Sequence, residues 1–139
     1  MSENIGNKLP PPLRFDLGEK ATGEICRAVL LITVDADGAP RVAVLSPGEV
    51  KALDERRLGI EVHGQTTTAK NLGRGSSALV WCVLDAAAYS MRGTPSPAIQ
   101  SAQGFAAFEI TLNDVLKDFQ AGSPMVAGPT YKNLGSGRG

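Results

Sequence analysis

Short apolar segments, each ended by turn-forming residues, recur along this chain, and no long amphipathic helix lies between them. Short runs rich in Val, Ile and Leu, bounded by Gly, Pro and Asp, are typical of β-strands. The pattern predicts six strands, at residues 27–34, 40–46, 58–62, 77–84, 88–94 and 104–111. Strands in this order with only small helices favour an antiparallel barrel or sandwich, so we expect a mainly β fold.

The first two predicted strands are interpreted as a hairpin. The connection contains Asp35 and Gly38, and Gly takes the positive φ that a tight turn requires at little steric cost. Alternation along the second strand places Arg41, Ala43 and Leu45 on one face and the intervening residues on the other. The fourth predicted strand is apolar nearly throughout, which indicates a central strand covered on both faces.

Periodicity and capping residues predict four short helices, at residues 17–25, 49–53, 67–72 and 112–119, with Gly73 as the C-cap of the third. Before and after the β domain, Pro-rich and Gly-rich stretches read as extended chain. We therefore expect an extended arm over residues 1–16, a single domain over 17–119 and an extended tail over 120–139.

Composition narrows the classes of function. Lys plus Arg and Asp plus Glu number 14 each among 139 residues, so no net field favours nucleic acid or an anionic membrane. The start carries no signal-peptide pattern and no apolar run has the length of a membrane span, so we expect a cytoplasmic protein. Cys26 and Cys82 lie among apolar neighbours without metal-type spacing, which predicts buried reduced thiols.

The segment after the third predicted strand offers a binding site for an anion. Three threonines, residues 66–68, precede Ala69, Lys70, Asn71 and Leu72. A Thr before an apolar-periodic run is a common helix N-cap, and the start of a helix presents unpaired backbone N–H groups. Hydroxyl donors and a Lys one turn into the helix complete a cradle for phosphate. An ordinary capped surface helix with a solvated Lys remains the alternative.

The turn region at residues 34–40, the Thr-x-Lys segment at 68–72 and the segment at 89–94 follow one another in an order that resembles the pyridoxamine 5'-phosphate oxidase-like family. The resemblance covers roughly residues 20–119. It implies a six-stranded antiparallel Greek-key split β-barrel that binds FMN. It also implies a homodimer with the flavin in a groove between the two subunits.

By this resemblance, Thr68 and Lys70 hold the flavin phosphate, with Thr67 and Asn71 beside them. The second strand borders the flavin ring through its backbone at Ala43, Val44 and Leu45, with Ser46 at its end. Members of the family place an Arg on this strand, where the matching position is Ala43, and Arg41 on the same face is the candidate substitute. His63, the only histidine, is a candidate for a flavin-proximal or acid–base role.

Two departures from the oxidase bear on the reaction. Its substrate-gripping Lys is replaced by the neighbourhood of Pro47 and Gly48, and its long C-terminal segment is missing, which argues against oxidation of pyridoxamine phosphate. The resemblance favours a flavin-dependent oxidoreductase acting on an unidentified small molecule. The alternatives are a non-catalytic module for flavin, deazaflavin or haem, and a structural dimer without cofactor. For Arg92, pairing with a carboxylate at the dimer interface and contact with the partner's flavin both remain open.

Overall fold

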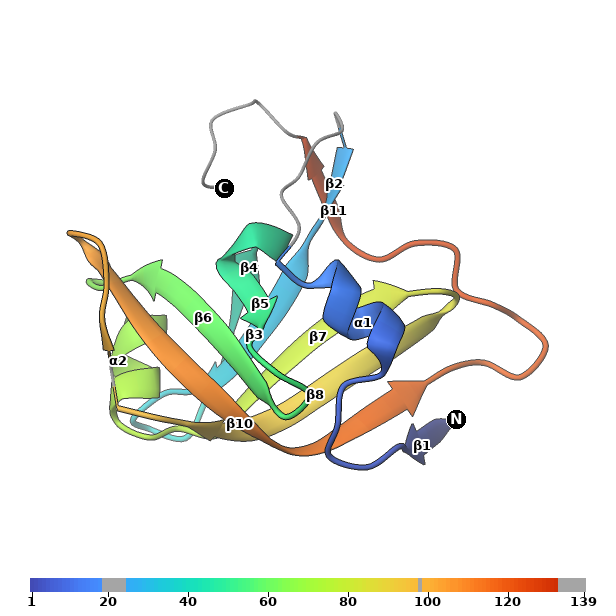
Figure 1. Cartoon of the computed structure of the whole chain (residues 1–139), viewed down its shortest axis with the longest axis horizontal. Helices are drawn as coiled ribbons and strands as arrows, with labels where there is room; N and C mark the ends of the chain where they lie inside the picture. The colour runs from blue at the N-terminus through green and yellow to red at the C-terminus, as the bar shows by residue number, and fades with distance from the viewer. Residues whose placement is uncertain (19–24, 98, 133–139) are drawn as a thin grey trace.

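A curled antiparallel sheet carries most of the chain (Figure 1). The computed structural model describes residues 1–18, 25–97 and 99–132. Within them the strands are β1 (Ser2–Asn4), β2 (Ile25–Arg27), β3 (Val29–Val34), β4 (Pro40–Leu45), β5 (Val50–Ala52), β6 (Arg57–His63), β7 (Ala78–Leu84), β8 (Ala87–Pro95), β9 (Ile99–Gln100), β10 (Phe105–Asp118) and β11 (Thr130–Lys132). The helices are α1 (Pro11–Asp16), α2 (Thr67–Gly73) and the 3₁₀ turn η1 (Pro47–Glu49).

The main sheet has nine strands in these described residues, and its central path runs β4-β3-β7-β8-β10-β6-β5. The strands β1 and β9 add to β10 outside this path, and β2 with β11 forms a second, two-stranded sheet. The mainly β, antiparallel prediction is confirmed, as are the first hairpin and the central position of the fourth predicted strand, β7. The sheet exceeds the predicted six strands because β1, β5 and β9 are too short for the sequence pattern to single out.

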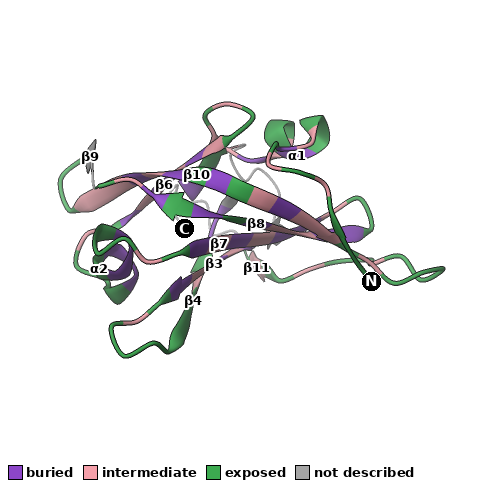
Figure 2. Ribbon diagram, turned by 90° about the horizontal axis from the view of Figure 1, so that it is seen from below, coloured by how far each residue is buried: buried purple, intermediate pink, exposed green. Residues whose placement is uncertain are grey.

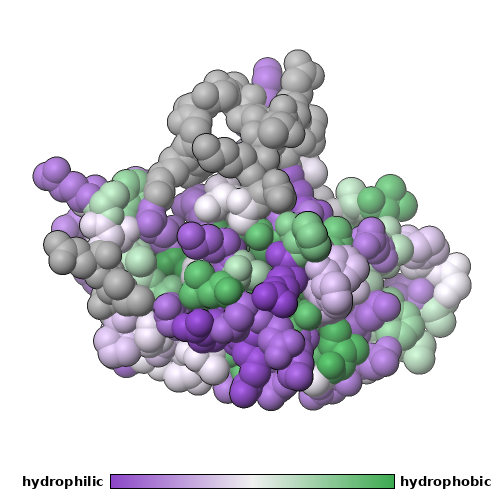
Figure 3. Space-filling model, viewed as in Figure 1, coloured by the Kyte–Doolittle hydropathy of each residue, from purple (hydrophilic) through white to green (hydrophobic). Residues whose placement is uncertain are grey.

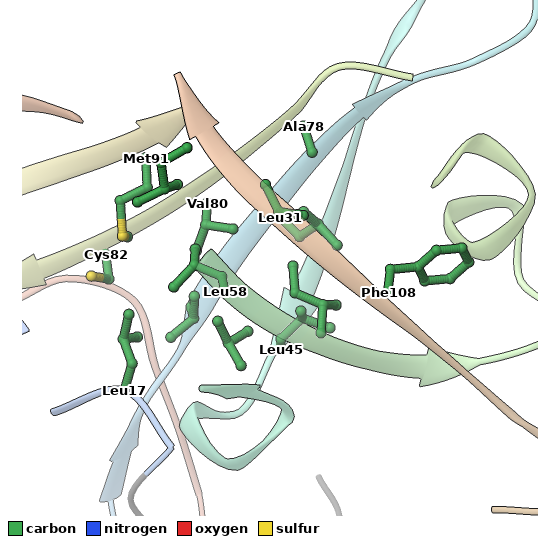
Figure 4. Packing of buried hydrophobic residues seen from close by; sticks show 14 of the residues in the cluster. Leu17, Leu31, Leu45, Leu58, Ala78, Val80, Cys82, Met91 and Phe108 are labelled. Atoms are coloured by element: carbon green, nitrogen blue, oxygen red, sulfur yellow. The ribbon is translucent and has the colours of Figure 1, made fainter. Parts of the chain in front are cut away.

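The inner face of the curled sheet forms the hydrophobic core (Figure 4). Side chains from β3, β6, β7 and β8 meet there, and the fully buried ones include Leu31, Leu58, Val80 and Met91. Cys82 joins this core as a free thiol, and burial raises its pKa to about 12. A thiol with so high a pKa is inert at neutral pH, as its sequence context predicted. The side chain of Cys26 lies outside the described residues.

The helix predicted at residues 112–119 is wrong, because β10 continues through this segment. Leu112 and Val115 are both fully buried although three positions separate them. A β-bulge between Leu112 and Asp114 shifts the register against β8 and returns Val115 to the core face. A bulge inserts one residue into a period-two pattern, and the resulting spacing imitates one turn of a helix.

Three further predictions of local structure need correction. The helix predicted at 49–53 does not form: Glu49 ends η1 and Val50–Ala52 form β5. Val50 enters the core while Lys51 faces solvent, which is the alternation of a strand. A helix forms at Pro11–Asp16 within the predicted extended arm, where Pro11 occupies the first turn and Leu13 is buried. In the helix predicted at 17–25, residues 19–24 lie outside the described residues, Leu17 and Gly18 are not helical, and Ile25 begins β2.

The end of α2 lies slightly beyond the prediction. Gly73 is the last helical residue and Arg74 is the C-cap, while the positive φ expected near this end occurs at Gly75. The Gly75 amide donates to the Leu72 carbonyl, which closes the helix. None of the helices in the described part of the chain has the length and apolar character of a membrane span.

Candidate functional site

The start of α2 is organised by Thr66. Its hydroxyl accepts a hydrogen bond from the Ala69 amide at 3.1 Å and donates to the His63 carbonyl at 2.8 Å. The predicted Thr N-cap is therefore present, and it ties the helix directly to the end of β6. Because the cap uses the first threonine of the run, the next two hydroxyls are left for other contacts.

Two side chains at this end of α2 reach solvent. Thr67 and Lys70 are exposed, and neither side chain pairs with any residue in the described ranges. Thr68 lies between them in sequence but is almost completely buried against the core. A free hydroxyl and a free ammonium at a helix start are the donors expected of a phosphate cradle, and Thr67 presents its hydroxyl more openly than Thr68.

Asn71 connects α2 to the first hairpin. This side chain is buried, and its amide donates to the Thr33 hydroxyl at 3.0 Å and to the Asp35 carboxylate at 2.8 Å. Its oxygen accepts from Arg74, whose guanidinium also donates to the Val34 carbonyl at 2.7 Å. Asn71 is therefore committed to the protein, and its contribution to a ligand site is to hold α2 in place.

Arg41 joins the same network. Its Nε and Nη2 donate to the two Asp35 oxygens at 2.8 and 3.1 Å. Asp35 thus links Arg41 on the hairpin to Asn71 on α2, and Figure 2 shows α2 beside this hairpin. Hydrogen bonds from the Arg41 guanidinium and then from Asn71 hold the pKa of Asp35 below its usual value. The network keeps a cation from β4 close to the helix that carries Lys70.

Replacing Asn71 by Ala is expected to lower the free energy of unfolding by about 2–3 kcal/mol, because the buried Thr33 hydroxyl loses its partner and Asp35 loses a donor. Urea denaturation would measure the change. Thr67→Ala is the matched control on the same helix and should shift stability by less than about 0.5 kcal/mol, since this exposed side chain makes no hydrogen bond with the described residues. Equal stability of Asn71→Ala and the wild type would contradict the role assigned to the network.

The second strand of the hairpin, β4, ends the sheet and pairs only with β3 among the described strands. One backbone edge of β4 is consequently open along Ala43, Val44 and Leu45, the residues predicted to border a flavin ring. The Leu45 side chain is buried in the core, and the Ser46 amide and hydroxyl both donate to Glu49 at 3.0 Å. Neither side chain is therefore available to a ligand, and the Ser46 amide is also occupied by Glu49.

An apolar surface continues from β4 across the outer face of the sheet. Val42 and Val44 are 58% and 65% exposed, and Val34 is also exposed. By the strand register, Ile32 and Leu79 share this face and are partly buried. We call these five residues the outer apolar face. A hollow of about 430 Å³ lies where this face meets β8 and β10, and its lining includes Ile32, Val34 and Leu79.

His63 ends β6 beside the N-cap of α2, and Arg92 on β8 lines the hollow next to the outer apolar face. The exposed His63 ring packs on Phe105 at a centroid distance of 4.5 Å, and the His63 carbonyl serves the N-cap. The Arg92 guanidinium pairs with Asp114 of the same chain, through bonds of 2.7 and 2.5 Å. Arg92 therefore has a partner within the subunit, which neither sequence alternative included.

Sequence reasoning missed Thr33, Asp35 and Arg74 as members of the site. Asp35 was interpreted only as a turn former, and nothing in the local pattern distinguishes that role from bridging Arg41 and Asn71. One signal was present: Asn71 follows Thr67 by four positions and Arg74 follows Asn71 by three, so the three residues share a helix face. A polar stripe on a helix that also carries core residues indicates buried polar partners.

This fold is similar to those of several solved proteins. No family model matches the sequence, and no curated protein matches it. A proposed pyridoxamine 5'-phosphate oxidase from Lactobacillus delbrueckii is similar in structure, with a TM-score of 0.62, 19% identity and coverage of 81% of this chain and 97% of that one. An FMN-binding protein from Syntrophomonas wolfei has a TM-score of 0.54 at 14% identity, covering 64% and 75% of the two chains. The haem storage protein HutZ from Vibrio cholerae has a TM-score of 0.53 at 15% identity, covering 68% and 88%.

The fold class follows from these likenesses. The chain has the split-barrel fold of the pyridoxamine 5'-phosphate oxidase-like proteins, and the predicted fold class is confirmed. Its solved neighbours include proteins named for FMN and for haem, so the fold itself is shared by binders of different cofactors.

Proposed function

We propose that this protein binds FMN at a homodimer interface and acts as a flavin-dependent oxidoreductase on a small molecule. The observation that carries the proposal is that α2, with the exposed Lys70, lies beside β4, a strand with an open backbone edge and exposed apolar side chains. Lys70 and Thr67 are exposed at the start of α2, and the network through Asn71 and Asp35 holds that helix against the hairpin containing β4. A phosphorylated flavin requires donors for its phosphate beside an apolar surface for its ring.

The phosphate end is assigned to Lys70 and Thr67, with Arg41 as an additional cation. Asp35 neutralises part of the Arg41 charge, so Lys70 is the cation at this end without a counterion among the described residues. Thr68 and Asn71 support the cradle from below, since both are buried in the packing of α2. An ammonium–phosphate contact of this kind is a charge-assisted hydrogen bond, which is stronger than a neutral one.

The ring end is assigned to the open backbone edge of β4, where N–H and C=O groups are free to contact the polar edge of a flavin. FMN would supply the electron transfer, and the chain would supply binding, orientation and exclusion of water. The outer apolar face leaves Val42 and Val44 more than half exposed, and an exposed apolar patch is typical of a protein–protein contact. A second copy of the chain is the partner proposed to cover it, as the resemblance implies.

The likeness to HutZ supports haem as the second candidate cofactor. A haem iron needs an axial ligand, and His63 is the only histidine in the chain. The His63 ring is exposed and stacks on Phe105, so it could reach a ligand without leaving the sheet. FMN is preferred because Lys70 and Thr67 provide for a phosphate, which haem lacks.

An absorption spectrum after reconstitution tests the proposal. Purified protein would be incubated separately with excess FMN, with riboflavin and with haemin, and then desalted. Retained flavin bands after FMN, with less retention of riboflavin, are expected. Reduction of the bound flavin by NADH or NADPH followed by reoxidation would support the oxidoreductase assignment. A haem spectrum without flavin retention would favour the haem module, and no retained chromophore would favour a structural dimer.

Dimer formation through the outer apolar face predicts that Val44→Asp dissociates the protein. A carboxylate on this face would be buried unpaired in the dimer, so we expect the dimer dissociation constant to rise by at least about tenfold. Size-exclusion chromatography with light scattering, run over a dilution series, measures it. Val126→Asp is the control, because Val126 is 97% exposed and lies outside this face. A wild-type protein that is monomeric at every concentration would refute the dimer.

A further inference from the structure

A groove separate from the proposed flavin site is lined by residues of the N-terminal arm, α1 and β5 and by Glu55. Figure 1 shows where these elements lie in the fold. Its volume is about 740 Å³, which falls in the range of small-molecule sites. We call it the arm groove. Most of its lining is apolar: Ile5, Leu9, Pro10, Pro11, Phe15 and Ala52. None of the residues of α2 or β4 lines it, so it does not depend on the flavin proposal.

The arm groove also holds three charged side chains, Lys8, Arg14 and Glu55. The Lys8 ammonium lies 3.6 Å from the Glu55 carboxylate, so these two charges compensate each other. The Arg14 guanidinium makes no hydrogen bond or ion pair with any residue that the structure describes. Arg14 is therefore the one charge of the groove without a counterion among the residues that the structure describes, and it stands above an apolar floor.

An exposed aromatic side chain borders the same groove. Phe15 on α1 is 82% exposed, whereas Leu9 in the floor is almost completely buried. Figure 3, which shows the face that carries α1, has hydrophobic side chains at the surface between hydrophilic ones. A large apolar side chain left in water beside a hollow gains most when a ligand with an apolar body covers it.

We propose that the arm groove binds an amphipathic monoanion, with an apolar body along the groove and a single carboxylate at Arg14. Charge complementarity argues for this occupant, because one free guanidinium fits one anionic group and the apolar lining rejects a highly charged molecule. A membrane surface is a poorer fit, since interfacial binding relies on several cations around an apolar helix face, and Arg14 is the one cation of this lining without a counterion in the described part of the chain.

Isothermal titration calorimetry with decanoate tests the proposal, and decan-1-ol serves as the uncharged counterpart. Arg14→Gln is expected to weaken decanoate binding about tenfold and to change decan-1-ol binding by less than about twofold. Arg14→Lys should restore part of the decanoate affinity. Ala52→Trp fills the groove and should weaken both ligands by about tenfold or more. Lys132→Gln, an exposed cation outside the groove, should leave both unchanged.

Several outcomes would overturn the proposal. Equal decanoate affinity of the wild type and Arg14→Gln would rule out the contact between the carboxylate and Arg14. Undiminished binding by a folded Ala52→Trp would rule out the arm groove as the binding site. The titrations are repeated with FMN present, and competition between FMN and decanoate would assign the fatty acid to the flavin site. Sedimentation with phosphatidylglycerol vesicles in the absence of decanoate binding would identify a lipid surface as the ligand. Failure to bind FMN would leave the groove proposal untouched.

Discussion

Replacing Lys70 by Ala is expected to weaken FMN binding about 10- to 150-fold, the equivalent of about 1.5–3 kcal/mol, because the phosphate loses the cation that has no counterion among the described residues. Quenching of flavin fluorescence during titration gives the dissociation constant. The fold should be unaffected, since the Lys70 side chain is exposed and makes no hydrogen bond or ion pair with the described residues.

Two controls separate the phosphate contact from a general effect. Riboflavin lacks the phosphate, so its affinity should be the same for the wild type and Lys70→Ala. Lys51→Ala removes an exposed cation from β5, at the other end of the sheet path from β4, and should bind FMN as the wild type does. Unchanged FMN affinity in Lys70→Ala would remove Lys70 from the site.

Gly93→Ala is expected to lower the free energy of unfolding by about 3 kcal/mol. A Cβ atom at this position would lie 2.3 Å from the Thr111 carbonyl oxygen and 2.6 Å from a methyl group of Ile110. Both contacts belong to β10, which is held by β8 on one side and by β6 on the other, so it cannot move away at low cost. Thermal and urea denaturation would both report the loss.

Gly73→Ala is the matched control for this prediction. A Cβ atom there has no neighbour within 4 Å, and Gly73 is the last helical residue of α2. Because Ala is the better helix former, the control should change stability by less than about 1 kcal/mol, in the stabilising direction. Wild-type stability of Gly93→Ala would mean that β8 and β10 separate more easily than their pairing indicates.

The strands that local pattern alone could predict are those with clean alternation or a continuous apolar run. The hairpin of β3 and β4 was predictable because its turn contains Gly38, whose φ is 90°. The end of β10 was not, because the bulge after Leu112 gives its buried residues a helical spacing. Only pairing with β8, which is distant in sequence, distinguishes a bulged strand from a short helix at this point.

The candidate site also has a part that local sequence predicts and a part that it does not. The capped start of α2, with an exposed Lys70 beside it, follows from the order of Thr66 to Lys70, since capping and helical spacing are local. The network that joins Asp35 to Arg41 and to Asn71 does not follow from local sequence, since Asp35 and Asn71 lie 36 positions apart. Local sequence pattern therefore accounts for the first hairpin, for the strands with clean alternation and for the donors at the start of α2. Two features depend on the tertiary structure, because both follow from how the sheet curls. These are the polar groups that α2 and the hairpin bury against each other, and the apolar face that the sheet leaves open.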